Sequence, residues 1–204
     1  MSFAQIFSAQ TTLLDAHIVS VEIDLSKGLH SFSIVGLPDK AVEESRDRVN
    51  AALKNSDFEK SDSFKAPKHN NMKIVVSLAP AVLKKEGPLF DIPIALAYLR
   101  ASGELDIDLD KSLFFGELSL DGHIRPTKGV LPLVQKAQFE GFEYVFVPAA
   151  NAQEAALIKG ITIYPAETLK EIVDHIRGVN VIDAYTNTSR DTQKSPEKKV
   201  LESI

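Results

Sequence analysis

A Gly-Pro turn followed by a long apolar run is the first place in this sequence where chemistry could take place. The segment KKEGPLFDIPIALAYLRASGEL (84–105) contains the turn Gly87-Pro88. An exposed turn that opens a buried helix can present a nucleophile, or can bind an anion at the free N–H groups of the helix. The next residue is Leu89, however, and Asp91 is expected to cap the helix with its carboxylate. That carboxylate would occupy the positive end of the helix, where an anion would otherwise bind. A structural role for Asp91 is therefore favoured over a functional one.

The other motifs provide no site for a nucleotide or a metal. The stretch GHIRPTKG has Thr127 where a phosphate-binding loop needs its second glycine, and Gly129 where it needs a hydroxyl. It is therefore expected to form a β-turn and a strand. The sequence has no cysteine and no histidine pair with metal-ligand spacing. The histidines are His17, His30, His69, His123 and His175. We expect no catalytic, metal or cofactor site in this chain.

Two small groups of basic residues are candidates for contact with a neighbouring subunit or with DNA. Arg46 and Arg48 lie among acidic residues on a helix expected from Pro38 or Asp39 to Asn55, where a solvated face of mixed charge is the simpler interpretation. Arg125 and Lys128 form a separate basic spot. Because such side chains bind phosphate groups, this spot is the best local candidate for a phosphate contact.

The elements that must position these residues alternate between strands and helices. Apolar alternation and β-branched runs predict strands over 3–9, 16–25, 30–37, 72–80, 112–120, 123–126, 144–148 and 161–165. Helices are expected over 39–55, 91–102, 130–140, 151–159 and 166–176, the second of them buried on most sides. This order predicts an α/β or α+β fold, in which helices pack against a mixed sheet.

Length and composition limit the classes of protein to consider. The chain has 204 residues, enough for one domain and a tail, and its net charge of −5 is unlike that of a basic nucleic-acid binder. It has no apolar run of membrane-spanning length and no secretory signal, and the lack of cysteine fits a reducing, cytoplasmic setting. We expect a folded domain over 1–180 and a flexible linker over 181–204, where the sequence becomes polar.

Three long stretches of the sequence resemble one family. These are FSIVGLPDKAVEESRDRVNAALKNSDF, VSLAPAVLKKEGPLFDIPIAL and GELSLDGHIRPTKGVLP. They are similar to the N-terminal domain of the magnesium chelatase-like AAA+ ATPases of the YifB/ComM competence group, across most of residues 1–178. The resemblance implies the Lon protease-like fold, which belongs to the ribosomal protein S5 domain 2-like class.

The same resemblance decides what the Gly-Pro turn can do. In the proteolytic Lon domain, a catalytic serine follows the Gly-Pro pair and a catalytic lysine follows a later glycine-rich stretch. These positions are Leu89 and Leu131 here, so neither nucleophile nor base is present and both leucines are expected to pack. The resemblance therefore implies a non-catalytic accessory domain. The alternatives are a diverged peptidase, with Ser77 or Ser119 as nucleophile, and a plain protein-interaction module.

The family also implies partners outside this chain. An AAA+ module would follow the linker, would bind ATP and magnesium, and would assemble as a homo-hexamer. The domain would support ring assembly and DNA engagement in recombination during natural transformation, without contact with a membrane.

Overall fold

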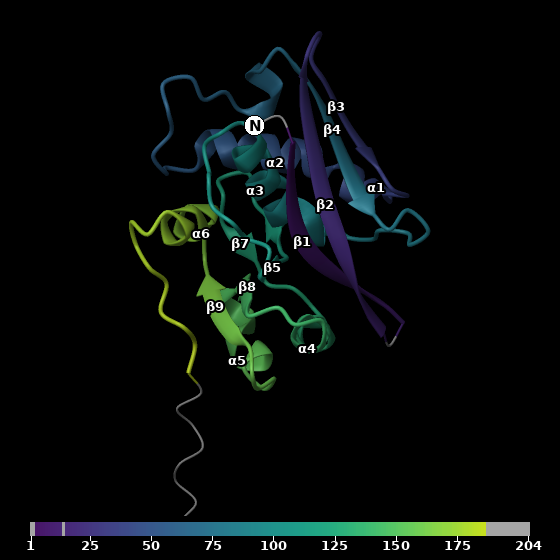
Figure 1. Ribbon diagram of the computed structural model, residues 1–204, viewed down its shortest axis with the longest axis vertical. Helices are drawn as coiled ribbons and strands as arrows, with labels where there is room; N and C mark the ends of the chain where they lie inside the picture. Colours follow the sequence, from purple (N-terminus) through teal and green to yellow (C-terminus); the bar gives the residue numbers. More distant parts are fainter. Residues whose placement is uncertain (1–2, 14, 187–204) are drawn as a thin grey trace, which may run out of the picture.

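A seven-stranded sheet runs through the part of the chain that the computed structural model describes, residues 3–13 and 15–186 (Figure 1). Its strand order is β3-β4-β2-β1-β5-β8-β9. The strands are β1 (Phe3–Thr12), β2 (Asp15–Lys27), β3 (Ser31–Val35), β4 (Met72–Ala79), β5 (Ser112–Phe114), β8 (Tyr144–Pro148) and β9 (Thr162–Ala166). β2 pairs antiparallel with β1 and β4, and the other neighbours are parallel, so the expected mixed α/β sheet is confirmed.

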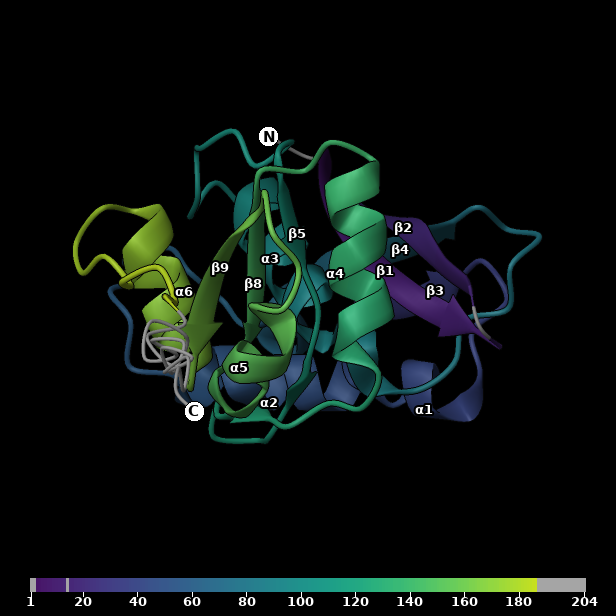
Figure 2. The ribbon, with the colours of Figure 1, turned by 90° about the horizontal axis from the view of Figure 1, so that it is seen from below.

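The helices lie on both faces of this sheet. They are α1 (Lys40–Glu43), α2 (Ser45–Asn55), α3 (Asp91–Ala101), α4 (Val130–Phe139), α5 (Ala152–Ala155) and α6 (Leu169–Ile176), with 3-10 turns η1 (Pro67–His69), η2 (Pro88–Phe90) and η3 (Ala149–Asn151). In Figure 2, α4 and α5 lie on the near side of the sheet and α2 and α3 on the far side. The short hairpin β6 (Glu117–Leu118) and β7 (Ile124–Arg125) forms a second sheet.

Alternation along the strands divides the apolar residues between two cores. Phe114 and Phe146 face the first core, with α2, α3 and α6, whereas Leu113 and Val145 face the second core, with α4 and α5. All but one of the α3 residues are buried, as the sequence predicts; the exception is Arg100. Because successive strand residues point to opposite faces, one strand can supply both cores.

Two expected elements are divided in the structure. The helix expected over 39–55 is interrupted at Glu44 between α1 and α2, although its predicted face, with Val42 and Val49, is buried. The strand expected over 112–120 becomes β5 and β6, because Gly116 has a φ of 151° and redirects the chain. These divisions matter because they place Arg48 on α2 and Leu118 on β6 beside the start of α3.

Residues just after the expected domain boundary at 180 form contacts with the rest of the chain. The Ile182 N–H donates to His175 Nδ1 at 3.0 Å, and the Tyr185 N–H donates to the Ile163 carbonyl at 2.8 Å. Ile182 also packs against the first core. Residues 181–186, which the sequence assigns to a linker, therefore contact the domain; the rest of that predicted linker, 187–204, lies outside the described residues.

None of the helices in residues 3–13 and 15–186 is both long enough and apolar enough to cross a membrane.

A substitution at Gly36, in the bend after β3, tests how closely the chain packs there. Gly36 has a φ of 102°, and a Cβ atom there would lie 2.1 Å from the Leu78 carbonyl oxygen. We expect Gly36→Ala to lower the free energy of unfolding by roughly 2 kcal/mol or more, through backbone strain and this clash. Gly28→Ala is the matched control, because no atom lies within 4 Å of its added Cβ. Chemical denaturation that finds equal stability for the two variants would contradict this packing.

Candidate functional site

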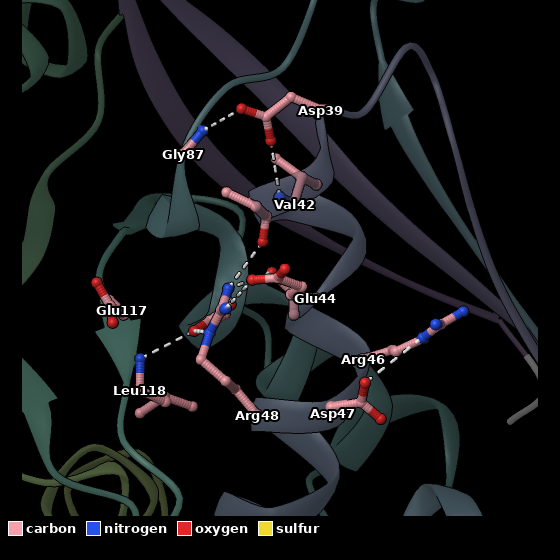
Figure 3. Close-up of polar contacts among 12 residues, drawn as sticks. Asp39, Val42, Glu44, Arg46, Asp47, Arg48, Gly87, Glu117 and Leu118 are labelled. Carbon is pink, nitrogen blue, oxygen red and sulfur yellow. Dashed lines mark hydrogen bonds and ion pairs between the residues drawn. The ribbon is translucent and has the colours of Figure 1, made fainter.

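The Gly-Pro turn is anchored through Asp39. One carboxylate oxygen of Asp39 accepts from the Val42 N–H at 2.8 Å and so caps α1, and the other accepts from the Gly87 N–H at 3.1 Å (Figure 3). Gly87 has a φ of 77°, which glycine adopts readily. Pro88 then opens η2, which leads directly into α3. The turn is therefore bound to the entry of α1 before the buried helix begins.

Asp91 is not the helix cap that the sequence predicts. η2 joins α3 without a break, so the cap position falls on Phe90 and Asp91 becomes the first residue of the helix. From there the carboxylate reaches Arg48 of α2, with Nε at 2.6 Å from Oδ2 and Nη2 at 3.0 Å from Oδ1. It also accepts from the Leu118 N–H of β6 at 3.0 Å. The Asp91 side chain thus connects α2, α3 and β6.

The expectation that Arg48 lies on a solvated face is also wrong. Its side chain is 17% exposed and that of Asp91 is 0% exposed. The guanidinium also donates to the Ala41 carbonyl at 3.0 Å and the Ser45 hydroxyl at 3.1 Å, with Glu44 at 3.8 Å (Figure 3). Sequence reasoning pairs Arg48 only with Glu44, because Asp91 is 43 residues away. Arg48 is therefore occupied within the domain.

Burial and pairing act in opposite directions on these two charges. Burial raises the pKa of the Asp91 carboxyl, while hydrogen bonds from Arg48, Ser45 and the Leu118 N–H oppose the rise. Burial alone would lower the pKa of Arg48, but the hydrogen bond and charge of Asp91 raise it above the ordinary value. Each buried charge is stabilised by the opposite charge of its partner, so the role of the pair is structural.

The two positions that the resemblance assigns to protease chemistry hold hydrocarbon side chains. Leu89 is partly exposed and packs against the second core, which agrees with the expected packing role. Leu131 is also partly exposed, in the first turn of α4, and its backbone N–H donates to Glu154 Oε1 at 3.1 Å. The start of α4 therefore receives a carboxylate from α5, which the sequence reasoning missed.

Asn151 holds the loop before α4 in place. Its Oδ1 accepts from the Thr127 N–H at 2.9 Å and its Nδ2 donates to the Thr127 carbonyl at 2.8 Å. No local pattern signals these contacts: Asn151 makes no side-chain hydrogen bond that caps α5, and Thr127 lies 24 residues away. The GHIRPTKG stretch is thus pinned by side chains of η3 and α5.

The alternative nucleophile Ser119 belongs to a turn-stabilising cluster. Its hydroxyl forms a hydrogen bond with the Asp121 carboxylate, which also lies 3.2 Å from His123 Nδ1. The Ser119 hydroxyl and the His123 N–H hold the pKa of Asp121 at about 2. A nucleophilic serine needs a base that removes its proton, whereas the Asp121 carboxylate is a weak base that only accepts a hydrogen bond from the hydroxyl. The other alternative, Ser77, lies on β4 opposite Glu22 of β2.

The other predicted contact residues lie at the surface. Arg125 Nε is 3.3 Å from Glu117 Oε1, and its side chain is 60% exposed. Lys128 is exposed, and Arg46 Nε is 3.7 Å from Asp47 Oδ2 on the outer side of α2 (Figure 3). Contact of these residues with DNA or a subunit stays a prediction. Within residues 3–13 and 15–186, no three His, Asp or Glu side chains gather as a metal site would require.

The buried ion pair generates a prediction with an internal control. Asp91→Asn leaves the Arg48 guanidinium buried without its counter-charge and should lower the free energy of unfolding by about 3 kcal/mol. Asp47→Asn removes a carboxylate of the same size from an exposed pair with Lys68 and should change it by less than about 1 kcal/mol. Urea unfolding of both variants measures the difference; a loss for Asp91→Asn no larger than that for Asp47→Asn would refute the structural role.

Comparison with known proteins agrees with this geometry. The family model for subunit ChlI of Mg-chelatase matches residues 21–151. The competence protein ComM of Haemophilus influenzae is 37% identical over 193 residues, 94% of this chain and 36% of its own length. The uncharacterized protein YifB of Escherichia coli is 34% identical over 184 residues, 90% of this chain and 34% of its own length.

A protease relative matches a shorter region. Lon protease 2 of Bacillus subtilis is 33% identical over 99 residues, 48% of this chain and 18% of its own length, which supports the Lon-like fold. The chain spans little more than a third of the length of ComM and YifB. Since the ChlI match covers well over half of the sequence, the chain belongs to the Mg-chelatase subunit ChlI family.

Proposed function

We propose that this chain is a non-catalytic accessory domain of a longer, magnesium chelatase-like AAA+ ATPase. The proposal depends on which side chains stand at the two positions that correspond to the protease dyad. Leu89 and Leu131 supply no nucleophile or base, and Asp91 is committed to Arg48. A domain that keeps this framework without its reactive groups is suited to binding and assembly. ATP and magnesium would be bound by the remaining part of the longer protein.

The proposed setting is a hexameric ring that engages DNA in the cytoplasm. The support comes from the relatives, of which one is named a competence protein. Competence implies handling of incoming DNA, so recombination during natural transformation is the process that we propose for the longer protein. This domain would contribute to ring assembly and to contact with the strand.

Activity assays on this chain separate the accessory role from the peptidase alternative. We expect background rates with ATP and with casein or a fluorogenic peptide, because the dyad positions hold leucine. Robust ATP turnover would contradict the assignment of that activity to another module. Peptide hydrolysis that disappears in Ser77→Ala or Ser119→Ala would favour a diverged peptidase instead.

The longer protein tests the assembly role. Analytical ultracentrifugation with ATP should show hexamers for the intact protein and a clear shift to smaller species after deletion of residues 1–186. Unchanged hexamers together with unchanged DNA-stimulated ATP turnover would contradict an accessory role in assembly and DNA engagement.

A further inference from the structure

A small pocket lies between the start of β3, the outer side of α2 and the 3-10 turn η1. It has a volume of about 280 Å³ and is lined by His30, Phe32, Arg46, Asp47 and Lys68. This volume is at the lower limit of the roughly 300–1,000 Å³ of sites for larger ligands, so it suits one small, flat group. Its residues come from separate segments of the chain, which the fold brings together.

Helix geometry explains why Arg46 faces this pocket while Arg48 does not. Residues two apart on an α-helix are separated by about 200° around its axis. Arg48 points inward to Asp91, and Arg46 points away from it, beside Asp47 (Figure 3). The Arg46 side chain is 54% exposed, in contrast to 17% for Arg48. Arg48 therefore has a structural role, whereas Arg46 is available at the surface.

The charges that line the pocket are predominantly positive. Asp47 is the only acidic residue among them; Lys68 Nζ lies 2.7 Å from one of its oxygens and Arg46 Nε lies 3.7 Å from the other. A hydrogen bond from Lys68, followed by the charges of Lys68 and Arg46, lowers the pKa of Asp47, so its carboxylate stays ionised. One carboxylate thus stands between two cations, where an incoming phosphate can compete for both.

An aromatic ring completes the pocket. Phe32 is partly buried, with one part of its side chain against the first core, and it also lines the pocket. His30 is held by its Nδ1, 3.2 Å from the Asn70 carbonyl oxygen. An aromatic surface beside two cations is the combination with which proteins bind unpaired bases and their phosphates.

We propose that this pocket binds one nucleotide of single-stranded nucleic acid, with its base against Phe32 and its phosphate between Arg46 and Lys68. The proposal rests on the proposed engagement of DNA and gives it a location, distinct from the spot at Arg125 and Lys128. A base can reach Phe32 only when it is unpaired, so a duplex offers the pocket phosphate contacts alone. The pocket therefore favours single strands over duplexes.

Fluorescence anisotropy of a labelled oligothymidylate tests this with the chain itself, at low salt and over a salt series. Arg46→Gln and Lys68→Gln should each weaken binding, and because the two cations share one phosphate, the double variant should reduce the slope of log K against log[salt] by about 0.7. Phe32→Leu, which keeps an apolar side chain against the core, should weaken binding by about 5- to 100-fold. Asp47→Asn should tighten binding, because it removes the charge that competes with phosphate.

The matched control is Lys111→Gln, which removes an exposed cation that is paired with a carboxylate, Glu143, outside the pocket and should leave the affinity nearly unchanged. Thermal melting of each variant separates loss of binding from loss of folding, and the gain expected for Asp47→Asn cannot arise from unfolding. Duplex of the same length should bind at least about tenfold more weakly than the single strand, because its paired bases cannot reach Phe32.

The binding results can separate failure of this pocket from failure of the proposed DNA engagement. Single-strand binding that survives Arg46→Gln, Lys68→Gln and Phe32→Leu but is lost in Lys128→Gln would overturn the pocket and leave DNA engagement standing. No binding of any nucleic acid by the wild-type chain at low salt would overturn both for this domain. Equal affinity for single strand and duplex would overturn the role of the unpaired base.

Discussion

The ion pair between Arg48 and Asp91 is the interaction on which the arrangement of α2, α3 and β6 depends. It joins α2 to the first turn of α3, and through the Leu118 N–H it also joins β6. Such a pair is costly to bury, and it persists because both carboxylate oxygens and the Nε and Nη2 atoms of the guanidinium have partners. This pair of side chains therefore positions α2, the buried helix α3 and the β6–β7 hairpin relative to one another, while Asp39 anchors the Gly-Pro turn.

Carboxylates of the chain itself already lie at the starts of α3 and α4. The first turn of α3 carries the Asp91 carboxylate, and the start of α4 receives the Glu154 carboxylate at the Leu131 N–H. Free helix N-termini attract anions, but here each one already has a negative group from the chain itself. The residue after the Gly-Pro turn contributes packing through Leu89. The pocket at Arg46 and Lys68 is the surface at which we propose that this domain binds its ligand.

Periodicity in the sequence predicts most of the sheet and the buried helix, because burial determines the order of apolar residues along each strand. It cannot predict interactions that depend on the path of the chain. The partner of Arg48 is 43 residues away, and nothing local indicates that η2 would run directly into α3 and turn Asp91 sideways. The break at Glu44 was missed for the same reason. Of the pocket, only Arg46 was a candidate, since His30 and Lys68 meet it through the fold.

A double-mutant cycle on Arg48 and Asp91 tests the central claim most directly. Arg48→Met and Asp91→Leu should each destabilise the chain strongly, because each leaves one buried charge unpaired, while the double variant should recover much of the loss. The account predicts a coupling free energy of about 2 kcal/mol or more in equilibrium unfolding. Losses that simply add, with a coupling below about 0.5 kcal/mol, would show that the pair does not hold these elements together.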